Sequence, residues 1–240
     1  MTELSPLAAA LAAAHLDGTR IAPAAAPADF AEALSVQAEV SRQLGPVGGF
    51  KVAQRPGQAP IMAPIRAERI LASGAVVPVA DRLGIELEVA FEILTPLPPE
   101  ATIQELAAHI RPRPAIELVD TRLEGPLAED PLAKLADMQI NAGLVLGAPL
   151  LDWDGRDFGQ VMARVRAGED MILDGAAEVP FGSALATFRA LVQAAGTHCG
   201  GLQPGQVVIT GSLCGLPYFP SGTDIEGHID GLGEVSVSLR

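Results

Sequence analysis

The sequence contains few of the residues on which several classes of protein depend. Only two of its 240 residues are cysteines, Cys199 and Cys214, and their spacing fits neither a metal site nor a disulfide framework. No run of about 18 apolar residues occurs, which argues against a membrane-spanning helix. The N-terminus carries Glu3 and no early Lys or Arg, which argues against a secretory signal or transit peptide. We therefore expect a cytoplasmic protein with two free thiols.

Positive charge is also scarce. The chain has 16 Lys and Arg against 29 Asp and Glu, a formal net charge of −13. No basic cluster or aromatic stacking platform offsets this charge, so we do not expect nucleic-acid binding. An anionic small molecule would need local positive charge from a metal or from a specific Lys or Arg. The four histidines are scattered and none pairs at i, i+4 as in a zinc site.

The first 45 residues are expected to be helical. An Ala/Leu-rich helix is predicted over 4–16, before the turn at Asp17-Gly18. A second helix is predicted from Asp29 to Gly45, where Asp29 and Glu32 have the spacing of a capping box.

From residue 46 onward, short apolar runs separated by Pro and Gly indicate a strand-rich body. The clearest strand covers 85–94, in which apolar residues alternate with Glu86, Glu88 and Glu92. Further elements are predicted as a helix from Thr102 to near Ile110, a strand over 115–119, a helix over 130–146, a strand over 206–210, a loop at 211–212 and a closing hairpin over 229–239. This order favours one α+β domain spanning 1–240 over a doubly wound sheet.

Glu86 and Glu88 lie two residues apart on the clearest strand, so their carboxylates share one face, with Cα atoms roughly 6.5 Å apart. Glu117 lies between Ile116 and Leu118 on the next predicted strand and could face the same pocket. Hard cations such as Mg²⁺ and Mn²⁺ prefer oxygen ligands of this kind. The alternation alone also fits a half-solvated sheet face, which is the expectation for Glu92.

Five sequence blocks resemble, in order, the 2-keto-4-pentenoate hydratases and 4-oxalocrotonate decarboxylases of the fumarylacetoacetate hydrolase superfamily. These blocks are residues 49–52, 85–91, 114–122, 205–212 and 231–237, which read GFKV, IELEVAF, PAIELVDTR, GQVVITGS and GLGEVSV. The likeness covers nearly the whole chain.

The resemblance implies a mixed, curled β-sheet, as a roll or barrel, with N-terminal and peripheral helices. It implies a homo-oligomeric enzyme, possibly in complex with a related pathway enzyme, in which Glu86, Glu88 and Glu117 hold Mg²⁺ or Mn²⁺. A small 2-oxo acid would chelate this metal, which supplies the positive charge that the acidic chain lacks.

The same resemblance assigns roles to residues around the metal. Lys51 would hold an oxyanion or shuttle a proton, although a lone lysine is more often a surface group. Thr210, Gly211 and Ser212 would bind substrate, with Ser212 also catalytic, although these residues also fit an ordinary strand-end turn. Asp120 and Arg122 would be a pair near the ligands or a surface ion pair.

Two departures from the family pattern concern the pocket. Ile61 stands where the hydratases carry an aspartate in a Pro-Asp-aromatic-Gly block, so a candidate acid or base is missing. The family's Ala-Asp-Asn-Ala-Ser block reads ADMQIN over 136–141, which loses the serine unless Asn141 replaces it. The first departure leans toward decarboxylation.

The leading hypothesis is a metal-dependent, hydratase-like lyase acting on a short unsaturated 2-oxo acid from aromatic degradation. One alternative is decarboxylation of 2-oxo-3-hexenedioate. The others are hydrolysis of a C–C bond in an acylpyruvate and a non-catalytic relative that binds a 2-oxo acid.

Overall fold

The computed structural model describes residues 5–54 and 57–240. Helix α1 spans Pro6–Asp17, and helix α2 spans Phe30–Leu44. Leu4, the predicted first residue of the first helix, lies outside the described residues. Asp29 caps α2 by accepting from the Glu32 N–H, as predicted, while the Glu32 carboxylate accepts from the Ala28 N–H at 2.6 Å.

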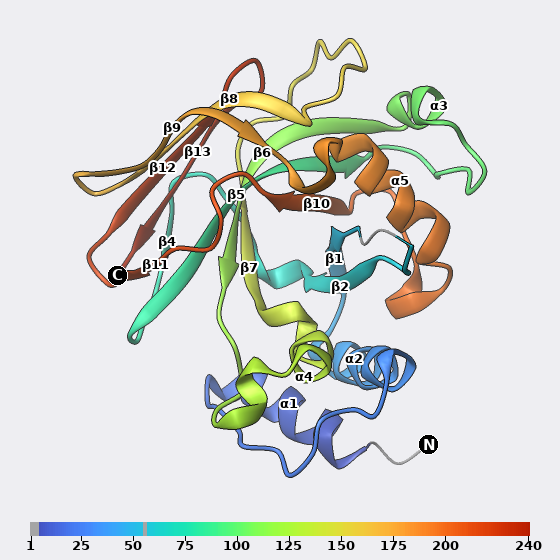
Figure 1. The fold of residues 1–240 in the computed structure, drawn as a ribbon, viewed down its shortest axis with the longest axis vertical. Helices are drawn as coiled ribbons and strands as arrows, with labels where there is room; N and C mark the ends of the chain where they lie inside the picture. Colours follow the sequence, from blue (N-terminus) through green and yellow to red (C-terminus); the bar gives the residue numbers. More distant parts are fainter. Residues whose placement is uncertain (1–4, 55–56) are drawn as a thin grey trace.

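Two sheets form the body of the molecule (Figure 1). The larger has eight strands: β1 (Val47–Ala53), β2 (Ile61–Arg66), β3 (Ile70–Ala72), β5 (Arg82–Ile93), β6 (Ile110–Val119), β7 (Asn141–Leu146), β10 (Val207–Ser212) and β11 (Tyr218–Pro220). Its order is β2-β1-β10-β5-β6-β7-β3, with β11 also paired to β5. The smaller has the order β4-β13-β12-β8-β9, formed by Ala75–Val77, Gly233–Leu239, Asp224–Ile229, Gln160–Ala167 and Asp170–Glu178.

The described parts of both sheets are mixed, and neither sheet closes into a barrel. This agrees with the expected α+β class and with an open form of the curled sheet. The closing hairpin is also confirmed, because β12 and β13 pair directly from Asp224–Ser238 to Ile229–Gly233.

The main core lies between the two sheets. Ile85, Leu87 and Val89 of β5 are fully buried on the face that meets the smaller sheet. A Cβ on Gly227 of β12 would lie only 2.6 Å from Leu87 Cδ1, so a glycine is needed where the sheets approach. The even-numbered side chains of β5 therefore face the other way, where the glutamates lie.

The remaining helices lie at the periphery. Helix α3 is Ile103–Ala107, α4 is Pro131–Ala136 and α5 is Ala184–Ala194. In the described part of the chain, the 3-10 turns are η1 (Ala67–Arg69), η2 (Pro126–Glu129), η3 (Met138–Ile140), η4 (Pro180–Gly182) and η5 (His198–Gly200). Helices α1, α2 and α4 enclose a second apolar core at the lower end of Figure 1, and α5 packs on β10 and β1. None of the described helices combines the length and apolar character that crossing a bilayer requires.

The prediction of one helix over 130–146 is wrong after Ala136. Asp130 and Pro131 begin α4 as a cap and first-turn proline should. Met138, Gln139 and Ile140 then adopt positive φ angles of 51°, 49° and 57°, which end the helix. Residues Asn141–Leu146 form β7, whose apolar side chains are buried in the sheet between β6 and β3.

Two smaller boundaries also differ from the sequence analysis. Helix α3 begins after Thr102 with the predicted capping box but ends at Ala107, because β6 starts at Ile110. Gly211 and Ser212, predicted as a loop, end strand β10 after a register shift that follows Ile209.

Candidate metal centre

Three glutamates on adjacent strands converge on one point. Glu86 of β5 is the direct register partner of Glu117 of β6, and Glu88 is two residues further along β5. Cross-strand partners project from the same face of a sheet, so the antiparallel pairing brings all three together. Each offers a carboxylate oxygen within 4.8 Å of the others. Within residues 5–54 and 57–240, this is the only group of three or more acidic, histidine or cysteine side chains so arranged.

The three carboxylates are removed from solvent. Glu88 is 2% exposed, Glu117 is fully buried, and Glu86 is partly buried. Glu117 Oε1 accepts hydrogen bonds from Lys51 Nζ and Asn141 Nδ2, both at 2.7 Å. Glu88 Oε2 accepts from the Gly211 N–H at 2.5 Å. These contacts fix Glu117 from β1 and β7, and Glu88 from β10.

One oxygen of the cluster has no partner among the described residues. Glu117 Oε2 is buried and accepts no hydrogen bond. A buried carboxylate oxygen without a donor is costly, so in most proteins it is bonded to protein, water or a metal. This unpartnered oxygen suits a cation that also touches Glu86 and Glu88.

Crowding changes the acidity of the cluster. Burial, and then the charge of Glu117, raise the pKa of Glu86 to about 8 and raise the pKa of Glu88 well above its ordinary value. Burial alone would lower the pKa of Lys51, but the neighbouring glutamates, led by Glu117, raise it above its usual value. The lysine therefore stays charged at neutral pH.

The formal charges of the site fit a divalent cation. Three carboxylates and one ammonium leave 3 − 1 = 2 negative charges when all are ionised. A buried site with this excess is stabilised by a bound cation, which would also restore the glutamates to their ionised form. Carboxylate oxygens of this kind suit Mg²⁺ and Mn²⁺. The residues present fit the metal that the sequence analysis expects.

Lys51 and Ile61 share the face of the sheet that carries the glutamates. Lys51 of β1 pairs with Ile209 of β10 and with Ala63 of β2, and Ile61 lies two residues before Ala63. Ile61 is partly buried and packs against the apolar core around α2. An apolar side chain therefore stands on the strand position at which the family pattern has an acid.

The sequence analysis missed Gln139. Its backbone oxygen accepts from Lys51 Nζ at 3.3 Å, and its side-chain Oε1 is buried without a partner among the described residues. It was missed because three consecutive non-glycine residues with positive φ leave no pattern in a sequence. Asn141 was noted only as a replacement for a family serine, and its amide in fact contacts Glu117.

The three residues expected to bind substrate have different surroundings. The Thr210 hydroxyl is buried and donates to the Val89 carbonyl oxygen at 3.0 Å. Gly211 donates its N–H to Glu88, and Ser212 is the register partner of Glu88. Ser212 Oγ donates to the Gly215 carbonyl oxygen at 2.6 Å.

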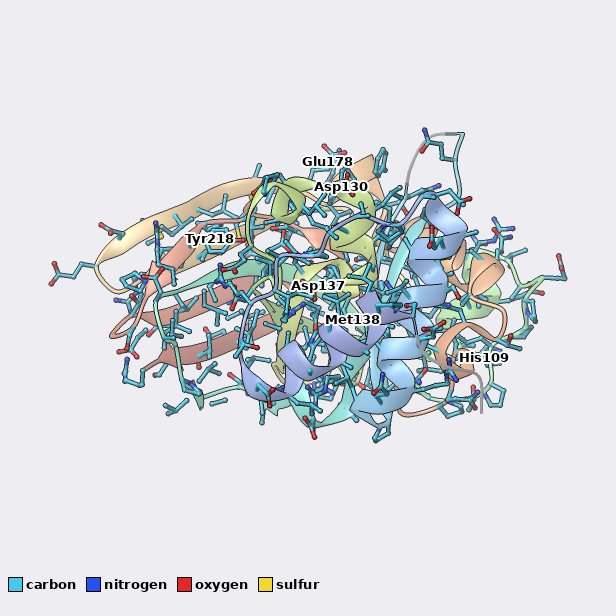
Figure 2. The ribbon with its side chains drawn as sticks, turned by 90° about the horizontal axis from the view of Figure 1, so that it is seen from below. His109, Asp130, Asp137, Met138, Glu178 and Tyr218 are labelled. Carbon is cyan, nitrogen blue, oxygen red and sulfur yellow. The ribbon has the colours of Figure 1, made fainter. Side chains whose placement is uncertain are left out.

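Asp120 and Arg122 do not pair with each other. Asp120 accepts from Arg20 at 2.8 Å in a partly exposed ion pair. Arg122 instead donates from Nε to Asp137 Oδ1 at 2.7 Å, in the buried centre where Asp137 lies beside Met138 and α1 (Figure 2). Arg122 follows β6 and Asp137 precedes η3, and the two segments are joined by a hydrogen bond from the Asp120 N–H to the Ile140 carbonyl oxygen at 3.0 Å.

Comparison with known proteins gives the same fold. No family model matches the sequence. The structure is similar to 4-oxalocrotonate decarboxylase from Pseudomonas putida G7, solved with calcium and acetate and with magnesium and adipate. In each case the TM-score is 0.78 at 21% identity, over 98% of this chain and 96% of the other. Fumarylpyruvate hydrolase from Pseudomonas aeruginosa, in complex with Mn²⁺ and pyruvate, gives 0.57 at 15% identity over 79% and 88%.

At these identities the likeness concerns the fold, and it extends over almost the full length of the decarboxylase. This fold agrees with the one implied by the resemblance of the five ordered sequence blocks. The chain therefore has the fold of 4-oxalocrotonate decarboxylase and, over a smaller share of its length, of fumarylpyruvate hydrolase.

Proposed function

We propose that this protein is a divalent-metal-dependent lyase that removes CO₂ from a short unsaturated 2-oxo acid. The single observation that carries the proposal is the buried cluster of Glu86, Glu88 and Glu117, with the charged Lys51 bonded to it. When bound, Mg²⁺ or Mn²⁺ would supply Lewis-acid polarisation of the substrate's 2-oxo group. The fold shared with a decarboxylase supports this class of reaction.

The three glutamates would hold the cation, and Asn141 and Lys51 orient Glu117 through hydrogen bonds to its Oε1. Gly211 does the same for Glu88 through its N–H. Because the neighbouring carboxylates raise the pKa of Lys51, its ammonium acts as a fixed positive charge rather than as a base. We assign it to the carboxylate or developing enolate oxygen of the substrate, with Ser212 beside Glu88 as a further contact.

Ile61 favours decarboxylation over hydration. Adding water across a double bond requires one group to activate the water and another to protonate carbon. Loss of CO₂ breaks one C–C bond, and the electron pair moves through the conjugated chain to the 2-oxo oxygen, which takes up a proton. The second reaction needs no acid on the strand position that Ile61 occupies. Thr210, whose hydroxyl is bonded to Val89, has a structural role in this proposal.

Two assays distinguish the possible reactions. CO₂ release from 2-oxo-3-hexenedioate, with Mg²⁺ or Mn²⁺, is the expected activity, and loss of absorbance from 2-hydroxypenta-2,4-dienoate reports hydration. Decarboxylation should disappear with EDTA and in Glu88→Gln. Glu92→Gln is the matched control, because Glu92 lies on the same strand but pairs with Arg113 instead.

Hydration without CO₂ release would contradict the decarboxylase proposal and support the hydratase hypothesis. Silence in both assays, combined with a thermal shift on adding oxalate and Mg²⁺, would show a non-catalytic relative that binds 2-oxo acids. Activity that survives in Glu88→Gln would contradict the assignment of the site.

A further inference from the structure

A cavity whose character differs from that of the glutamate cluster lies near the end of α1. Its volume is about 250 Å³, far more than the roughly 30 Å³ that one water occupies in the liquid. Segments from α1, β2, η1, the link after β4 and the region around β7 line it. The titratable side chains in its wall are His15, Arg20, Arg66, Arg69, Asp120 and Arg122.

The charge of this wall opposes that of the whole chain. Four of the chain's 16 Lys and Arg residues line the cavity, against one carboxylate, in a protein of net charge −13. Some of this positive charge is neutralised locally, because Arg20 pairs with Asp120 and Arg122 with Asp137. Arg66 also pairs with Glu68, which lies outside the cavity wall and is largely exposed. The wall nevertheless presents four arginines from three segments of the chain, since Arg66 and Arg69 both lie where β2 leads into η1.

One of the cavity arginines, Arg66, is not fully satisfied by the protein. Arg66 Nε is buried and has no hydrogen-bond partner among the described residues, while Nη1 reaches the His15 carbonyl oxygen only at 3.5 Å. Burial first, and then the charges of Arg69 and Arg122, lower the pKa of Arg66 despite its pair with Glu68. Like charges held this close are stabilised by an anion between them.

The cavity is separate from the metal centre. None of Glu86, Glu88 and Glu117 lines it. Leu83 and Leu118, which do line it, alternate with residues of the glutamate face and therefore project from the opposite face of the larger sheet.

We propose that this arginine-lined cavity binds a small oxyanion, either a phosphate group or an organic dicarboxylate. Guanidinium groups bind both through paired N–H donors, and the space admits a small organic acid or a phosphate ester. His15 stays neutral because burial lowers its pKa to about 4, so the arginines carry the recognition.

The wall of the cavity touches the metal centre at one residue. Asn141 lines the cavity and also donates its amide to Glu117 Oε1. Met138 lines it too and begins the turn in which the Gln139 carbonyl oxygen accepts from Lys51. An anion bound here is therefore expected to change the affinity of the glutamate cluster for metal. This link rests on the proposed metal site, whereas anion binding itself does not.

Calorimetric titration with inorganic phosphate and with glutarate tests the proposal. The full-length protein is titrated at constant ionic strength, once with saturating Mg²⁺ and once with EDTA. We expect binding of at least one anion in both conditions, and at least tenfold weaker binding in the double variant Arg66→Gln/Arg69→Gln. Arg42→Gln is the control, because it removes one positive charge, against two in the double variant, from an exposed position on α2 outside the cavity.

The preferred anion identifies the ligand class, as phosphate if it binds more tightly than glutarate and as a dicarboxylate in the opposite case. Absence of binding by either anion, or equal binding by the double variant and wild type, would overturn the proposal. Binding that disappears with EDTA would assign the anion to the metal centre instead and overturn it as well. For the link to Glu117, the Kd for Mg²⁺ should differ with and without the bound anion, and an unchanged Kd would overturn that link.

Discussion

Two buried acidic groups in this molecule are surrounded in contrasting ways. Asp137, fully buried, accepts from Arg122 at both oxygens and from the Thr121 hydroxyl at Oδ2. The glutamates of the metal centre share one lysine, and Glu117 keeps an unpartnered oxygen. Although burial opposes it, Arg122 lowers the pKa of Asp137, whereas burial and Glu117 raise the pKa values of Glu86 and Glu88.

The difference is the one expected between a structural carboxylate and the metal ligands that we propose. Asp137 is satisfied by the fold itself, and its bonds hold the left-handed turn of Met138, Gln139 and Ile140 in place. The buried glutamates lack enough hydrogen-bond donors and counterions within the protein, and a bound cation would supply the missing positive charge. Removing a partner of Asp137 should therefore lower the free energy of unfolding. Removing one of the three glutamates should instead reduce the repulsion among their carboxylates.

The largest expected effect follows from breaking the Asp137 cluster. Arg122→Met leaves a buried carboxylate without its counterion, which typically costs about 3–5 kcal/mol of unfolding free energy. Urea unfolding at pH 7 measures it. Arg20→Met, which breaks the partly exposed pair with Asp120, should change the unfolding free energy by less than about 1 kcal/mol. Equal, small losses in both variants would show that burial does not distinguish the two pairs.

A pH effect should come from His15, which lies 3.1 Å from Asp137. Burial, then Arg122, lower its pKa from 6.5 to about 4, so the unfolded chain binds more protons between these values. Stability is therefore lost as the pH falls from about 6.5 to about 4, by up to about 3 kcal/mol. Urea unfolding across this range should show a shallower loss in His15→Gln. Parallel curves for the variant and wild type would contradict the assignment.

The glutamate cluster should behave in the opposite way. Glu88→Gln removes one of three crowded carboxylates, so stability in EDTA should not fall. Glu88→Gln should, however, lose the stabilisation by Mg²⁺. For the wild type this stabilisation is expected to be about 2.7 kcal/mol of unfolding free energy at a Mg²⁺ concentration of 100 times Kd. Unfolding with and without Mg²⁺ measures both, and Glu92→Gln should retain the wild-type response. A destabilised metal-free Glu88→Gln would show that the cluster is structural, as Asp137 is.

A smaller effect is expected where the two regions meet. Asn141→Ala removes the amide donor to Glu117 without removing a ligand atom. Loss of such an orienting bond typically weakens metal binding roughly 10- to 100-fold. Calorimetric titration with Mg²⁺ measures the change. An unaltered Kd would mean that Lys51 alone orients Glu117.

The convergence of Glu86, Glu88 and Glu117 could be predicted from the sequence because part of its geometry is local. Alternation along one strand placed Glu86 and Glu88 on one face, and the resemblance added Glu117, which cross-strand register then set opposite Glu86. The capped starts of α2 and α3 were predictable for the same reason, since a cap and its partner lie three residues apart.

The Asp137 cluster was not predictable because its contacts are long-range. Arg122 had an acidic near neighbour in Asp120, and only tertiary packing joins it to Asp137. The left-handed turn over Met138–Ile140 contains no glycine, the residue from which such a turn is usually predicted. The sequence analysis therefore predicted a helix through residues that form β7. The positive cavity likewise gathers arginines from segments that are dispersed along the chain.

The most direct test of the central claim is a crystal structure with Mn²⁺, examined by anomalous diffraction. The account predicts one strong anomalous peak about 2.1 Å from an oxygen of each of Glu86, Glu88 and Glu117, with Glu117 Oε2 the expected ligand atom of its residue. A peak elsewhere, or no peak at the three glutamates at saturating Mn²⁺, would contradict it.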